Sequence, residues 1–109
     1  MTNTVVASGT QTATVTTEHV LNSPSGALTY VLVVDTAAMV SGDTLELRAY
    51  GTVLTGGTSR QCYSATYANA QADPLKVSIP LPGTGFGNSF TLKQTAGTGR
   101  AFPWSLLSL

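Results

Sequence analysis

The sequence predicts an all-β protein: an antiparallel β-sandwich, jelly-roll or immunoglobulin-like, with about seven or eight strands. Strand-like runs alternate with Gly, Pro, Asn and Asp along almost the whole chain. These turn signals recur about every 8–12 residues, the spacing typical of sandwiches and barrels. No segment keeps a helical period of apolar residues over three turns. We expect one sandwich domain over residues 1–109, because no linker or internal repeat divides the chain.

The first third of the chain leads into its most strand-like run. Residues 1–9 are expected to form a flexible N-terminal arm. Residues 10–21 predict one or two strands with a weakly apolar inner face, and residues 22–26 (NSPSG) are a strong turn signal. Residues 27–35 are apolar on both alternating faces, which predicts a central strand that is covered on both sides.

The middle of the chain predicts a hairpin. Residues 36–40 are compatible with a helical turn or a wide loop, and residues 44–54 alternate clearly between apolar and polar positions. In this run Leu45, Leu47 and Ala49 are expected to face the core, and Glu46, Arg48 and Tyr50 to face outward. Gly56 and Gly57 mark the hairpin tip, and residues 59–67 are the expected return strand.

Three further strands are expected in the last third. Residues 75–81 place Leu75, Val77, Ile79 and Leu81 on one face, and the prolines at 80 and 82 make this an edge strand or place its end at an edge. Residues 89–94 predict a short strand with Phe90 and Leu92 facing inward. Residues 100–109 end the chain with Phe102, Trp104 and Leu106 on one face.

Composition argues against several classes of partner. Only 9% of the residues are charged, the net charge is zero, and eighteen Thr and ten Ser supply a neutral polar surface. The five cations form no run, so a nucleic-acid-binding face is not expected. The start of the chain lacks the features of a signal peptide. The longest apolar run, residues 31–34, is far too short to span a bilayer, so no membrane partner is expected.

The chain offers little reactive chemistry. His19 has no nearby nucleophile motif, and no His, Cys, Asp and Glu stand at metal-ligand spacing. Cys62 excludes an intrachain disulfide because it is the sole cysteine, and we expect it to pack in or near the core. The sequence therefore predicts no enzyme, no catalytic or metal-binding residue and no cofactor.

One candidate surface for a protein partner lies on the expected hairpin. Tyr and Arg are enriched at interface hot spots. If the two strands pair, one sheet face could present the residues Glu46, Arg48, Tyr50, Arg60, Tyr63 and Tyr67. The alternative is that the tyrosines point into the core and that only Glu46 and Arg48 are exposed to solvent.

Several strings along the chain resemble a family of short proteins of tailed bacteriophages. They are residues 32–40 (LVVDTAAMV), 59–76, 92–100 (LKQTAGTGR) and 102–106 (FPWSL), and the likeness covers most of the chain. The family consists of small virion-associated or uncharacterised proteins, and its motifs carry no catalytic signature. The resemblance identifies no functional residues.

The resemblance implies a structural virion protein, made in the host cytoplasm and placed on the capsid surface. We expect a capsid decoration (cement) protein that binds the major capsid protein or another virion protein, and that is a homo-oligomer. A rigid β-domain that makes many weak contacts with a repeated lattice fits this role. Two alternatives stay open: a neck, tail or fibre component, and a carbohydrate-binding module that stacks sugars on exposed Tyr and Trp.

Overall fold

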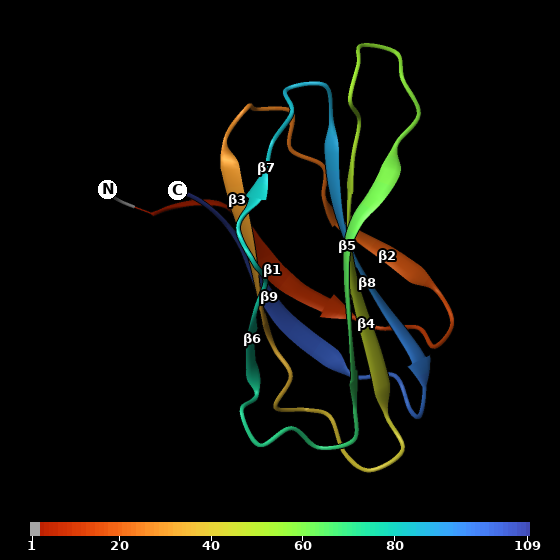
Figure 1. Cartoon of the computed structure of the whole chain (residues 1–109). Helices are drawn as coiled ribbons and strands as arrows, with labels where there is room; N and C mark the ends of the chain where they lie inside the picture. Colours follow the sequence, from red (N-terminus) through yellow and green to blue (C-terminus); the bar gives the residue numbers. More distant parts are fainter. Residues whose placement is uncertain (1–2) are drawn as a thin grey trace.

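The computed structural model describes residues 3–109, and this range contains nine β-strands and no helix (Figure 1). The strands form two antiparallel sheets, which confirms the predicted β-sandwich. Sheet A has the order β1-β9-β3-β6, with β7 also paired to β3, and sheet B has the order β2-β8-β4-β5. The strands are β1 (Thr4–Thr12), β2 (Glu18–Asn22), β3 (Thr29–Asp35), β4 (Thr44–Gly51), β5 (Arg60–Ala68), β6 (Leu75–Val77), β7 (Leu81–Pro82), β8 (Asn88–Ala96) and β9 (Ala101–Ser108).

The strands pair from the two ends of the chain inward. β1 pairs with β9, β2 with β8, β3 with β6 and β7, and β4 with β5. The ladders β3–β9 and β4–β8 then join these pairs into the two sheets. One long hairpin rolled into a double sheet is a jelly roll, in which β6 and β7 together fill one strand position. The pairing therefore favours the jelly-roll topology over the immunoglobulin-like one.

The core lies between the two sheets and is built from alternate residues of their strands. Tyr30 of β3 and Phe90 of β8 meet edge to face across the sandwich, with ring centroids 5.9 Å apart. The other large buried apolar side chains of this core are Leu32, Val34, Met39, Leu45, Leu47, Leu81, Leu92, Phe102 and Leu106. Each such side chain stabilises the fold by about 1.5–3 kcal/mol relative to full exposure. The inward sets predicted for β4, β8 and β9 are confirmed, although Trp104 is only partly buried.

The predicted edge strand over residues 75–81 is interrupted. Pro80 has no N–H to donate, so the regular ladder stops between β6 and β7. Ser78 bridges the gap: its N–H donates to the Leu32 carbonyl and its hydroxyl accepts from the Leu32 N–H, each at 2.9 Å. The edge position is confirmed, and the split accounts for one strand beyond the expected number.

The four apolar residues of this edge strand were expected to share one face, and this expectation is wrong. Lys76 lies opposite the buried Val34 and Ser78 is buried, so both face the interior. Leu75 and Val77 are consequently turned to solvent, whereas Leu81 is buried. The irregular stretch around Pro80 breaks the alternation, so residues on either side of it do not share a face.

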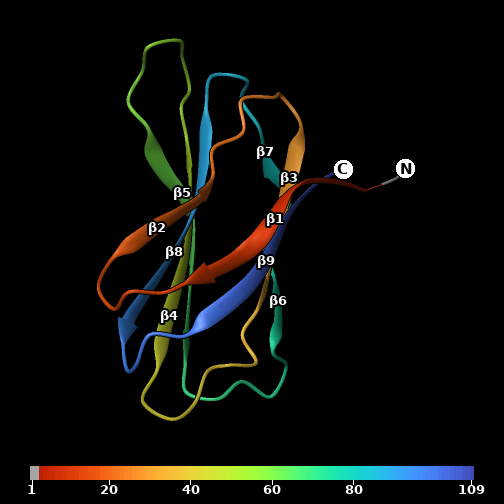
Figure 2. The ribbon, with the colours of Figure 1, turned by 180° about the vertical axis from the view of Figure 1, so that it is seen from behind.

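The expected flexible arm over residues 1–9 is wrong for residues 4–9, which belong to β1. This strand pairs with β9 from Thr4↔Ser108 to Thr12↔Ala101, with one irregularity between Val5 and Ala7. Figure 2 shows β1 lying along β9 on the side of the sandwich opposite β5 and β6. Residues 1–2 lie outside the described residues. Pairing with the far end of the chain outweighs the weak local strand signal of residues 4–9.

Asp43 joins two loops at one end of the sandwich. Its buried carboxylate accepts hydrogen bonds from the backbone N–H groups of Val40 (3.0 Å) and Thr98 (3.2 Å), and from Arg100 Nε (3.0 Å). The Val40 hydrogen bond lowers the pKa of Asp43; burial opposes this, and Arg100 and Thr98 add to it. This ion pair therefore ties the β3–β4 loop to the β8–β9 turn.

Candidate functional site

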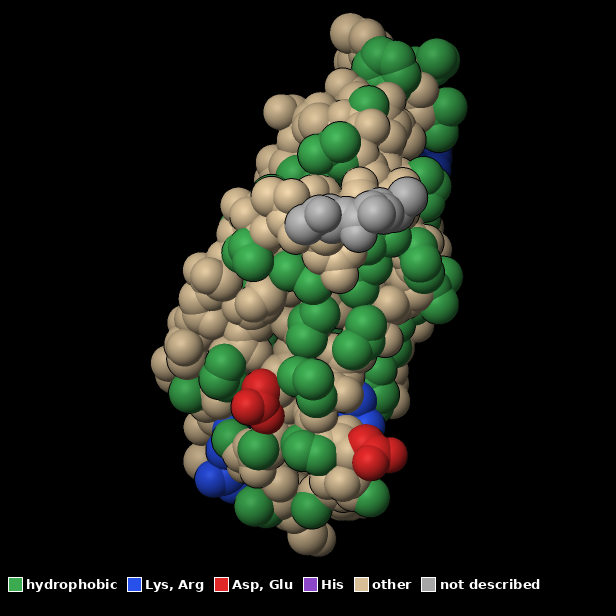
Figure 3. Space-filling view, turned by 90° about the vertical axis from the view of Figure 1, so that its left-hand side faces the viewer, with side chains coloured by type: hydrophobic (Ala, Val, Ile, Leu, Met, Phe, Trp, Pro, Cys, Tyr) green, Lys and Arg blue, Asp and Glu red, His purple; other side chains and the backbone are tan. Residues whose placement is uncertain are grey.

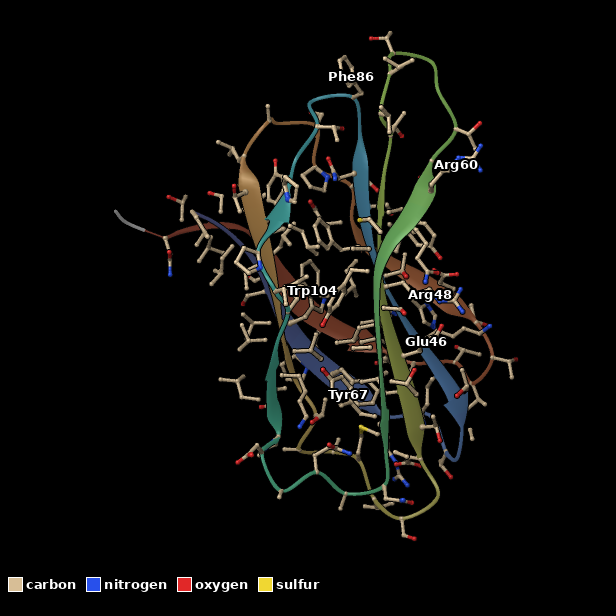
Figure 4. The ribbon with its side chains drawn as sticks, viewed as in Figure 1. Glu46, Arg48, Arg60, Tyr67, Phe86 and Trp104 are labelled. Atoms are coloured by element: carbon tan, nitrogen blue, oxygen red, sulfur yellow. The ribbon has the colours of Figure 1, made fainter. Side chains whose placement is uncertain are left out.

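The six residues predicted to bind a partner do not form one surface. Three lie on the outer face of sheet B, two on its inner face, and one near the loops at the end of the molecule (Figure 4). They are, in that order, Glu46, Arg48 and Tyr50; Tyr63 and Tyr67; and Arg60. Of the two alternatives left open by the sequence, Tyr63 and Tyr67 follow the one in which tyrosines face the core, whereas Tyr50 lies on the outer face.

Glu18 of β2, which the sequence did not single out, organises the outer face of sheet B. The hydroxyls of Tyr50 on β4 and Thr91 on β8 both donate to Glu18 Oε2 at 2.6 Å. Arg48 Nη1 lies 3.5 Å from Glu18 Oε1, and Arg48 Nε pairs with Glu46. The network therefore joins strands β2, β8 and β4 through side chains.

The charges in this network are partly shielded from water. The side chains of Glu18 and Arg48 are 30% and 28% exposed. Burial opposes ionisation of Glu18, but hydrogen bonds from Thr91 and Tyr50 and the nearby cations outweigh it and hold its pKa below the usual range. Contact with Tyr50 and Glu46 raises the pKa of Arg48. The polar atoms of this network bond mainly to one another. The network therefore stabilises the packing of neighbouring strands in sheet B.

Tyr63 and Tyr67 fill the side of the sandwich where β5, the edge of sheet B, faces β6, the edge of sheet A. They lie opposite Ala49 and Leu45, two core residues of β4, and pack against the core from the inner face of β5. Lys76 of β6 places its Nζ 4.9 Å from the centroid of the Tyr67 ring. Burial raises the pKa of Tyr67, and the neighbouring Tyr63 adds to the shift. Figure 4 shows Tyr67 and Trp104 between the two sheets.

Arg60 and Cys62 lie at the start of β5 beside a groove of about 330 Å³. Both side chains are exposed, so the expectation that Cys62 packs in the core is wrong. The register passes from Ala49↔Tyr63 to Tyr50↔Gln61, which leaves Cys62 as the extra residue of a bulge. The groove runs between β5 and the segment around β7.

The outer face of sheet A carries an apolar surface that the sequence prediction missed. We call it the apolar face; it consists of Val5, Val31, Val33, Leu75, Val77 and Leu107. Cross-strand pairing places these side chains on one side, as in Val5↔Leu107↔Val31 and Val33↔Val77. Figure 3 shows hydrophobic side chains in a band along this side of the molecule, with most of the charged groups near one end.

Large side chains on this face are well exposed. Val5, Leu75 and Val77 are 61%, 60% and 58% accessible. A shallow hollow of about 180 Å³ opens between Val33, Leu75 and Pro103. Contiguous apolar surface of this kind on a soluble protein marks an interaction site, whereas single exposed apolar residues need no explanation.

The sequence did contain a signal for the apolar face. Residues 27–35 are apolar at both alternating positions, which we interpreted as coverage on both sides. Sheet B covers only the inner side, and on the outer side Val31 is 8% exposed whereas Val33 is only half-buried. A strand that is apolar on both faces therefore indicates either burial in the chain or a partner.

The single histidine has a structural contact. His19 Nε2 accepts a hydrogen bond from the Thr14 N–H at 3.0 Å and so fastens the β1–β2 connection. Within residues 3–109, no three His, Cys, Asp or Glu side chains gather as metal ligands would. The same range has no helix that is long and apolar enough to cross a membrane.

Comparison of this chain with protein-family models, with curated proteins and with solved structures finds no match. The resemblance to small phage proteins therefore stays a prediction from the sequence.

Proposed function

We propose that this chain is a structural virion protein of a tailed bacteriophage, a capsid decoration protein that binds and stabilises the major capsid lattice. The apolar face of sheet A is the observation that carries the proposal. A broad sheet face with exposed Val and Leu side chains gains free energy when a partner removes it from water.

Two further observations support this role, beside the predicted resemblance to small virion-associated phage proteins. The jelly roll is an architecture that recurs in viral capsid domains, although it also serves lectins and other proteins. A zero net charge leaves little electrostatic repulsion between copies that sit close together on a shell.

Multivalency makes modest contacts sufficient for such a protein. Each copy presents one sheet face, and a homo-oligomer would present several to the repeated capsid surface. Linked contacts raise the overall affinity by about 10²–10⁴ over that of a single contact. Decoration therefore needs no deep pocket and no catalytic group in the chain.

The geometry favours this role over carbohydrate binding. A sugar-stacking surface needs aromatic rings that lie flat on an outer face. Tyr63 and Tyr67 lie on the inner face, and the Tyr50 hydroxyl is engaged by Glu18. A neck, tail or fibre component could use the same apolar face, and only its copy number would separate it from a decoration protein.

The test is quantitative mass spectrometry and cryo-electron microscopy of purified virions that carry this protein. We expect a copy number proportional to that of the major capsid protein, with density over the whole shell and the apolar face of sheet A against it. A few copies at one vertex would replace this proposal with a neck or tail role. Absence from the virion would overturn both.

A further inference from the structure

The two sheets have four edges, and β5 forms the long edge that lies beside an apolar groove. Within residues 3–109, β5 pairs with β4 alone. The facing edge of sheet A, formed by β6 and β7, is broken around Pro80; β1 carries an irregularity near Val5; and β2 has only five residues. Such interruptions, charges and prolines normally keep edges from pairing with other chains.

Apart from the bulge at Cys62, the edge of β5 lacks these protections over most of its length. The strand has nine residues, contains no proline, and carries a charge only at Arg60, its first residue. Along this strand, the Gln71 side chain covers only the last carbonyl, that of Ala68, at 2.8 Å. The free N–H and C=O groups of such an edge offer main-chain hydrogen bonds to an added strand.

An apolar groove lies beside the start of this edge. The groove of about 330 Å³ is lined on its far side by Ile79, Leu81 and two prolines, and at its end by Val53. Ile79 and Val53 are exposed despite their size. A strand added to β5 points every second side chain toward the groove, so these side chains should be apolar.

Arg60 adds a charge requirement at the same place. Its side chain is exposed, lines the groove and has no ion pair among residues 3–109. Arg48 and Arg100, by contrast, are both paired with carboxylates of the chain. A carboxylate on the incoming segment would complete the pairing of Arg60.

We propose that the free edge of β5 binds an extended segment of a protein partner as an additional antiparallel or parallel strand. The segment carries apolar side chains at alternate positions, which enter the groove, and a carboxylate that meets Arg60. This inference does not rest on the proposed function, because it concerns another surface than the apolar face of sheet A.

The test uses the whole chain and a defined peptide. The probe is an acetylated, amidated peptide of sequence Glu-Val-Thr-Val-Thr-Val-Thr, and the control is the same peptide N-methylated at every backbone amide. Backbone NMR shifts and amide hydrogen exchange locate the contact. We expect slowed exchange and shifted signals in β5, and at least about a tenfold weaker affinity for the methylated peptide, because it cannot donate main-chain hydrogen bonds.

Two variants test the side-chain requirements. Ile79→Asp should weaken peptide binding about tenfold or more, while Val20→Asp on the outer face of sheet B should leave it unchanged; both side chains are 59% exposed, so both variants should fold. Arg60→Glu should weaken binding of the Glu peptide and strengthen binding of the matching Lys peptide.

Four outcomes would overturn the inference: no binding at ~1 mM peptide, protection at another edge, equal affinity for the methylated peptide, or unchanged preference in Arg60→Glu. Slowed exchange in β5 that grows with protein concentration alone, without peptide, would also overturn it, because a second copy would then occupy the edge.

Discussion

The two outer faces of this sandwich differ in the polarity of the side chains that they expose to water. On sheet B, Glu18, Arg48 and Tyr50 bond to one another and to Thr91, so these polar side chains have partners within the chain. On sheet A, the corresponding side chains are valines and leucines, which are partly or well exposed in the described chain apart from the buried Val31. Both faces follow the same two-residue alternation, yet the side chains of one are mainly polar and paired, and those of the other are mainly apolar.

This difference supports sheet A as the docking face in the proposed function. A satisfied polar network gains little from a partner, since docking would remove its groups from water without adding bonds. An apolar face gains free energy from burial wherever its shape is matched. The partner-binding residues predicted from the sequence lay mainly on the polar sheet, whereas the structure favours the opposite one.

The largest expected effect is a loss of capsid binding when the same substitution, Val→Asp, is made on the outer face of sheet A instead of sheet B. Val77 on sheet A and Val20 on sheet B are 58% and 59% exposed. We expect Val77→Asp to lower binding to undecorated capsids at least ~100-fold, because a carboxylate would be buried in an apolar interface. Val20→Asp should stay within about twofold. Cosedimentation with capsids measures both, and equal losses would contradict the assignment of the docking face.

A second prediction concerns the network on sheet B. Arg48→Ala should lower the free energy of unfolding by about 1–2 kcal/mol, because Glu18 and Glu46 lose the charge that balances their partial burial. Arg60→Ala removes an exposed arginine and should change it by less than about 0.5 kcal/mol. Urea titrations give both values, and a smaller loss for Arg48 than for Arg60 would refute the structural role of the network.

The pH dependence of stability tests whether Glu18 stabilises the folded chain through its charge. The pKa of Glu18 is lowered in the folded chain, so its stabilising contribution is present above its ordinary pKa of 4.5 and is lost as pH falls through the lower folded value. Glu18→Gln should therefore lower the melting temperature at pH 7 by about 2–4 °C. The difference from the wild type should shrink below about pH 4. A difference that stays constant with pH would show that Glu18 does not act through its charge.

The smallest expected effect uses Val→Thr on each face. Val77→Thr and Val20→Thr should each change the free energy of unfolding by less than about 0.5 kcal/mol, since both side chains are mainly exposed. Only Val77→Thr should reduce the fluorescence of a bound hydrophobic dye, because Val77 belongs to a contiguous apolar surface. Equal dye binding by the two variants would mean that this surface does not act as a patch.

Much of the fold could be predicted from local sequence. The alternation of Leu45, Leu47 and Ala49 with polar residues set the two faces of β4, and the same reasoning found the inward side of β8 and β9. Turn residues marked most strand ends. The errors fell where pairing partners were distant: residues 4–9 pair with the far end of the chain, and Pro80 shifts the alternation of its edge strand.

The site was harder to predict, because periodicity separates two faces without saying which one is inside. Tyr63 and Tyr67 share one face of β5, and only the position of Lys76 and the core shows that this face is the inner one. Glu18 lies far from Thr91 and Tyr50 in sequence, so no spacing could relate them. A bulge turned Cys62 outward, and bulges leave little trace in a single sequence.

By itself, the sequence determined that this is a low-charge, Thr-rich antiparallel sandwich with one apolar face on most strands, because side-chain alternation and turn chemistry are local properties. Three features could be assigned only once the strands were placed in space: the jelly-roll pairing, the apolar outer face of sheet A and the open edge of β5. These depend on which distant strands meet, and a strand's outer face and free edge exist only once its neighbours are in place.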